Sequence, residues 1–167
     1  MIKFYLKSFC IFLISIMICH FVNGQTYVKQ DATGANDGSS WVNAYSNLND
    51  ALGSTTSGDI WVASGLYIPT AMVVDSATTF KISNPINIYG SFIGTETNID
   101  QRDIVANPTT LSGDLNSDDI PNDFSVNKGD NVQHVIVVDS LIGATITIDG
   151  FVLSGGNSSA NTQGANE

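Results

Sequence analysis

One short pattern occurs twice in this chain and constrains its fold more than any other feature. Residues 86–90 read Ile-Asn-Ile-Tyr-Gly, residues 146–150 read Ile-Thr-Ile-Asp-Gly, and a phenylalanine follows each glycine within two positions. The alternation of isoleucine with polar residues has the two-residue period of a strand with one buried face. A looser copy, Ile-Trp-Val-Ala-Ser-Gly, occupies residues 60–65. Short apolar strands that recur at intervals of tens of residues predict a chain that coils and stacks on itself.

Each main copy of the pattern is preceded by another short apolar alternation. Phe80 and Ile82 alternate with Lys81 before an Asn-Pro corner at 84–85, and Val135 and Val137 precede the second copy. Two or three short strands per turn, separated by corners, are typical of a parallel β-helix. We therefore predict an all-β fold of this kind.

A single helix is predicted ahead of the strands. Apolar residues recur at steps of three and four over residues 41–52, at Trp41, Ala44, Tyr45, Leu48, Ala51 and Leu52. Such spacing places them on one helical face, with Ser39 or Ser40 as the N-cap and Gly53 at the end. A helix in this position would cover the first open edge of a stacked sheet.

The first 24 residues have the layout of a secretory signal peptide. Lys3 and Lys7 precede an apolar run over residues 9–18, and small or neutral residues follow at 22–24. A membrane anchor is the alternative, but the run is shorter than the roughly 20 residues that span a bilayer. Both cysteines, Cys10 and Cys19, lie in this leader, so the mature chain has no disulfide. We expect a secreted or bacterial cell-surface protein, associated with the outer membrane, without a membrane-spanning segment in the mature chain.

The predicted organisation has four parts. A signal peptide occupies residues 1–24, and an N-terminal strand, loop and capping helix occupy residues 25–58. Parallel β-helix coils follow over 59–156, and a polar loop over 157–167. Because nothing in the sequence closes the last coil, we expect a β-helix truncated after its first few coils, the N-terminal fragment of a longer protein.

The charge is strongly acidic, with 16 acidic residues against 6 basic ones. An acidic surface repels phosphate backbones, so nucleic acid is excluded as a partner. The same charge suits cations or simple solubility.

The acidic stretch after residue 113 predicts a calcium site. Asp114, Asn116 and Asp118 stand at alternate positions and supply three oxygen ligands on one side of a loop, the ligand type that Ca²⁺ takes. A helix-flanked calcium loop would need glycine at its sixth position and an acid at its twelfth, where this chain has Asp119 and Ser125. Asp123 is a further candidate ligand. The alternative is a solvated acidic loop without an ion.

Other candidate sites are weaker. Asp139 and Asp149 each follow a strand and would cleave glycosidic bonds only if their carboxyl groups lay about 5–10 Å apart. His134 has no serine or cysteine partner in a recognisable arrangement. Four rings could stack on sugars along one face or be covered by loops: Trp41, Trp61, Tyr67 and Tyr89.

Several ordered segments resemble a known family. They include Tyr-Val-Lys at 27–29, Gly-Ser-Ser-Trp at 38–41, Trp-Val-Ala-Ser-Gly-Leu-Tyr-Ile-Pro-Thr at 61–70, Ile-Tyr-Gly-Ser-Phe-Ile-Gly-Thr-Glu at 88–96, Gln-Arg-Asp at 101–103 and Leu-Ser-Gly-Asp at 111–114. The chain is similar here to secreted right-handed parallel β-helix proteins of Bacteroidetes, which have the pectin-lyase-like fold and are often described as polymorphic outer-membrane-protein-like. Ser91 departs from the family pattern, which often has a second glycine there.

The resemblance implies a right-handed β-helix with a structural, adhesive or glycan-binding role, whose partners would be glycans or another cell surface. We expect no catalytic site in this segment and no cofactor other than the candidate calcium. The alternative is the N-terminal part of a polysaccharide lyase or glycoside hydrolase whose active site lies in downstream coils.

Overall fold

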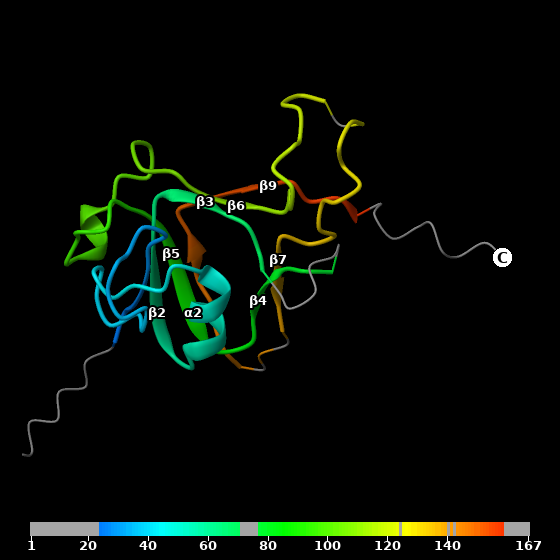
Figure 1. The fold of residues 1–167 in the computed structure, drawn as a ribbon. Helices are drawn as coiled ribbons and strands as arrows, with labels where there is room; N and C mark the ends of the chain where they lie inside the picture. The colour runs from blue at the N-terminus through cyan, green and yellow to red at the C-terminus, as the bar shows by residue number, and fades with distance from the viewer. Residues whose placement is uncertain (1–23, 71–76, 124, 140, 142, 159–167) are drawn as a thin grey trace, which may run out of the picture.

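The computed structural model describes residues 24–70, 77–123, 125–139, 141 and 143–158, and its named strands pair in parallel within three sheets (Figure 1). The first sheet has the order β1 (Thr26–Val28), β2 (Gly58–Ala63), β5 (Ile86–Phe92), β8 (Ile148–Asp149). The second has the order β3 (Gly65–Tyr67), β6 (Thr109–Ser112), β9 (Phe151–Ser154). The third pairs β4 (Phe80–Ile82) with β7 (Ile136–Val138).

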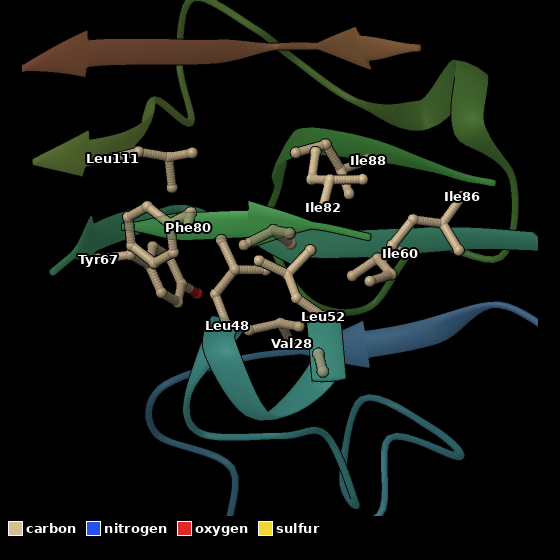
Figure 2. Close-up of a cluster of buried hydrophobic side chains, with 12 residues drawn as sticks. Val28, Leu48, Leu52, Ile60, Tyr67, Phe80, Ile82, Ile86, Ile88 and Leu111 are labelled. Carbon is tan, nitrogen blue, oxygen red and sulfur yellow. The ribbon is translucent and has the colours of Figure 1, made fainter. Parts of the chain in front are cut away.

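The repeated isoleucines align across the first sheet. Ile60 of β2 is the register partner of Ile88 of β5, which in turn is the partner of Ile148 of β8. Ile60 and Ile88 are 0% exposed and belong to the core drawn in Figure 2, together with side chains from the other two sheets. The alternation in the sequence therefore correctly predicts the strand faces that build the centre of the molecule.

A tight contact between β5 and β8 explains the glycine of the repeated pattern. A Cβ added at Gly90 would lie 2.3 Å from the carbonyl oxygen of Gly150, so no larger residue fits there without moving a strand. The next residue, Ser91, has φ of 70°, a conformation that favours glycine. Its Oγ donates to Gly150 O at 2.9 Å, and its N–H donates to Thr109 Oγ1 at 2.8 Å. These hydrogen bonds hold the bend between the sheets.

The helix α2 is shorter than the sequence predicts. It spans Leu48–Ser54, with Asn47 as its N-cap, and packs Leu48, Ala51 and Leu52 into the core beside β1 and β4. The predicted start near residue 41 was wrong, because residues 41–46 form turns and a single bridge between Val28 and Tyr45. The reason lies in the backbone: the carbonyls of residues 42 and 43 accept hydrogen bonds from the loop at 34–38 instead of from residues four positions later.

A polar segment after β5 is fastened to the loop before α2 and to β8 of the first sheet. It contains the short helix η1 (Ile99–Gln101) and ends in a turn over residues 103–107, before β6. Glu96 O accepts a hydrogen bond at 2.9 Å from the Trp41 indole, which lies near the start of the chain. Arg102 Nη2 forms a 2.8 Å ion pair with Asp149 Oδ2 in β8, and its guanidinium lies over Tyr89 and Phe92. The segment, called the strap below (residues 94–108), covers one side of the first sheet.

The predicted fold class was wrong. The described residues form three small sheets of unequal size, with four, three and two strands, and not a regular helical solenoid. The strap and a second long loop after β6 interrupt the repetition of short strands. A stacked coil would also bury the isoleucines of both copies of the pattern, but Ile148 of the second copy is 40% exposed. Within the described residues nothing stacks on the outer side of β8, so the second copy of the pattern is only half covered.

Two predictions concern residues that the structure does not describe. The signal peptide over 1–24 falls outside the described residues except for Gly24, and so does most of the polar stretch over 157–167. Among the residues that are described, no helix has the length and apolar character needed to cross a membrane.

Candidate functional site

A long acidic loop leaves the second sheet after β6 and returns to the point from which it started. We call the described residues between positions 114 and 131 the acidic loop. Val132 N–H donates to Gly113 O at 2.9 Å, and Gly113 N–H donates to Ser154 O at 2.9 Å, so the neck of the loop is tied to β9. A side chain at Gly113 would collide with Val132 Cγ2 at 2.3 Å, which explains the glycine at the neck.

The loop concentrates negative charge. It carries five aspartates and a single lysine, Lys128. Asp114 is buried at the neck, where its two carboxylate oxygens accept hydrogen bonds from the backbone N–H groups of Asp118 and Asp119 at 3.2 and 3.1 Å. Asp130 Oδ2 accepts from the N–H of Asn116 at 2.9 Å. The backbone of one half of the loop thus fixes carboxylates at its beginning and at its end.

Three of these carboxylates meet. Asp114, Asp118 and Asp130 each present an oxygen within 4.8 Å of the others. Loss of hydration raises the pKa of the Asp118 carboxyl, and the negative charges of Asp130, Asp114 and Asp119 raise it further. Like charges at this separation favour a proton or a cation between them.

A second set of hydrogen-bonded side chains in the loop is centred on Asp119. Asp119 Oδ2 accepts from Lys128 Nζ at 2.8 Å and from Asn131 Nδ2 at 3.0 Å. Burial raises the pKa of Asp119, but these hydrogen bonds and the Lys128 charge outweigh it and hold the pKa below its usual range. The other oxygens of this pair, Asp119 Oδ1 and Asn131 Oδ1, are buried and have no hydrogen-bond partner. A pocket of about 280 Å³ opens beside Asp119, between the loop and the end of β9.

The structure brings together two of the three residues predicted as calcium ligands. Asp114 and Asp118 lie in the cluster, and the backbone of Asn116 is bonded to its third member, Asp130. Sequence reasoning missed Asp130, since it lies at the far end of the loop and only the closed neck brings it back. Asp123 closes a turn instead: its Oδ1 accepts three hydrogen bonds from Ser125 and Val126.

The carboxylates considered for glycosidic cleavage have other partners. Asp139 follows β7 and pairs with Lys81 at 3.2 Å, whereas Asp149 belongs to a different sheet and pairs with Arg102. A hydrogen bond from Ser83, followed by the hydrogen bond and charge of Lys81, holds the pKa of Asp139 below its usual range. His134 is exposed just before β7. Each of these two carboxylates therefore forms an ion pair with a different basic side chain.

The aromatic side chains considered for sugar stacking are occupied by one another. Trp61 stacks on Phe92 at 4.6 Å between ring centroids, and Trp41 packs edge-on against Tyr27 at 4.7 Å. Trp61 is 3% exposed, and Tyr67 is buried. Tyr89 lies under Arg102 of the strap. Loops and neighbouring rings therefore cover Trp61 and Tyr67, whereas Trp41 and Tyr89 are half-buried.

No protein-family model, curated protein or solved structure matches this chain.

Proposed function

We propose that this chain is a non-catalytic structural and adhesive module of an exported protein, and that it binds an extended polypeptide on another cell surface through the outer edges of β7, β8 and β9. The proposal rests on a difference in cover between the first and the last strands of the three sheets. The first strands of the three sheets are covered, and within the described residues the last strands are not.

The covered end is built from the N-terminal segment. The helix α2 packs against β1 and β4, and Gln30 Nε2 donates to the Leu66 carbonyl of β3 at 2.6 Å. Tyr45 bridges to Val28 in parallel and occupies part of the outer edge of β1. A second copy of this chain stacked head to tail would meet these groups, so the first end is protected against such addition.

The last strands lack such cover within the described residues. β7, β8 and β9 are the final strands of their sheets and carry exposed apolar side chains in register with core residues of the preceding strands, which we call the open face: Val138, Ile148 and Leu153. Each is between 40 and 55% exposed. Exposed apolar groups beside unpaired strand edges are the features that recruit an added strand.

The parallel pairing of β5 with β8 indicates which kind of partner would bind at the open face. β5 accepts β8 in parallel with an isoleucine opposite an isoleucine, and the outer edge of β8 offers the same kind of edge again. An extended peptide with alternating apolar residues would continue this pairing, and an adhesive role follows if that peptide belongs to a neighbouring cell. Catalysis has less support, because Asp139 and Asp149 are held in separate ion pairs.

The test is a cell-adhesion assay with the purified, fluorescently labelled protein. Placing charges on the open face, in the double variant Ile148→Lys with Leu153→Lys, should reduce binding at least about tenfold, since a buried lysine opposes apolar contact. The matched control is Val105→Lys on the strap, where the side chain is 92% exposed and lies outside the open face.

Equal loss in both variants, or no loss in the double variant, would show that adhesion does not use this face. Cleavage of a polysaccharide by the purified protein would replace the proposal with an enzymatic function.

A further inference from the structure

The acidic loop has features that neither the core nor the open face requires. Its three clustered carboxylates repel one another, and Lys128, the single lysine of the loop, is bonded to a fourth carboxylate, that of Asp119. We propose that this loop binds one calcium ion between Asp114, Asp118 and Asp130.

The separation of the carboxylates suits a single ion. Ca²⁺ binds oxygen at about 2.3–2.6 Å, so two oxygens on the same ion lie at most about 5 Å apart. One carboxylate oxygen from each of Asp114, Asp118 and Asp130 lies within 4.8 Å of the other two. The carboxylates of Asp114 and Asp130 are already held by backbone N–H groups, and the third side chain, Asp118, is exposed to solvent.

Independent support comes from oxygens that have no partner. Asn131 is 1% exposed, and its Oδ1 is buried without a hydrogen-bond donor. It follows Asp130 directly, and its Nδ2 donates to Asp119, whose backbone N–H in turn donates to Asp114. Asp119 Oδ1 is a second buried oxygen without a donor. Among the described residues, these are the two buried side-chain oxygens that lack a partner, and both belong to the acidic loop. An unsatisfied buried oxygen is costly, and a cation bound close to these two oxygens would offset that cost.

The donor set selects the type of metal. Carboxylate and amide oxygens are hard ligands, and the cluster contains no histidine or cysteine, which argues against zinc. Calcium tolerates an irregular set of six to eight oxygens completed by water, whereas magnesium requires near-octahedral geometry. With three protein carboxylates, the expected dissociation constant is about 0.1–1 mM, the range of extracellular modules.

The experiment measures melting temperature and heats of binding on the purified full chain with CaCl₂, MgCl₂ or a chelator at constant ionic strength. At 10 mM CaCl₂ we expect the melting temperature to rise by about 3–8 °C over the chelated protein, and by much less with MgCl₂. Asp118→Asn should weaken calcium binding at least about tenfold while leaving the chelated protein folded, because its exposed carboxylate is a ligand and not a packing element.

Asp123→Asn is the matched control, since it removes the same charge from the same loop outside the cluster. Its calcium response should equal that of the wild type. A wild type that responds to neither ion, an equal response to magnesium, or an equal loss in Asp118→Asn and Asp123→Asn would each overturn the proposed calcium site. Because the loop and the open face are read out separately, these results do not depend on the adhesion test.

Discussion

The two copies of the Ile-x-Ile-x-Gly pattern lie on neighbouring strands of one sheet and have different surroundings. Ile88 lies between Ile60 and Ile148 and is excluded from solvent, whereas Ile148 has a partner on one side and is exposed on the other within the described residues. The same residue type in the same pattern therefore packs in one case and forms a surface in the other. A hydrophobic pattern selects a strand and its face, but burial needs a neighbour on both sides.

The sharpest test of this comparison is to shorten both isoleucines. Ile88→Ala should destabilise the protein by about 2–5 kcal/mol, because it leaves a cavity in a closed core. Ile148→Ala should cost less than about 1 kcal/mol, since solvent already reaches the side chain. Urea unfolding followed by circular dichroism measures both. Equal losses would mean that the two strands are buried alike.

A methyl group at Gly90, the glycine of the first copy, probes the contact between the same two strands. Gly90→Ala should cost about 1–3 kcal/mol, because its Cβ would collide with the Gly150 carbonyl and force β5 and β8 apart. The same unfolding assay applies, and Gly53→Ala is the control because nothing lies within 4 Å of a Cβ there. If Gly90→Ala is as stable as the control, the close approach of the strands is not present in solution.

Arg102 connects the buried strand to the exposed one and should matter less. Its guanidinium donates to the Gly90 carbonyl and pairs with Asp149 while lying over Tyr89. Arg102→Ala should cost about 1–2 kcal/mol, and Arg102→Lys should be intermediate because it keeps the charge and loses the fork. A change below about 0.5 kcal/mol, the size expected for an exposed ion pair, would show that the strap does not hold β8.

The smallest expected effect is the contribution of Glu96, in the strap, to the pH dependence of stability. Burial of Glu96 raises its pKa, but hydrogen bonds from the backbone N–H groups of residues 93 to 95 outweigh burial and lower the pKa below its usual value of 4.5. A depressed pKa in the folded state stabilises the protein above pH 4.5, and this stability is lost as the pH falls through the lowered value.

Fluorescence of Trp41 and Trp61 during unfolding at pH 7 and pH 3 measures this loss, because both indoles lie near the strap. Glu96→Gln should remove the part of the acid sensitivity that belongs to Glu96. An unchanged acid profile in Glu96→Gln would mean that this carboxylate does not stabilise the strap.

Local patterns in the sequence were sufficient to place the strands and several core residues. Alternation predicted β4 and β5, including Phe80, Ile82 and Ile88, because a strand's facing is set within a few residues. The start of α2 was missed, since residues 42 and 43 bond to a loop that precedes them. The solenoid prediction failed because local alternation does not report how many strands each sheet receives.

The acidic cluster shows the same limit. Asp114 and Asp118 were proposed together from their spacing, which a loop backbone can satisfy locally. Asp130 joins them only because Val132 returns to Gly113 and closes the neck. Asn131 gave no signal either, because an asparagine that will be buried looks the same in a sequence as one in solvent.

Native-state hydrogen exchange, read at single amides, tests the difference between the two strands most directly. The amides of β5 that face β2, on the inner side of the sheet, should exchange at least about tenfold more slowly than the amides of β8 and β9. Equal exchange in β5 and in β8 and β9 would contradict the account, because the last strands would then be as well covered as the centre.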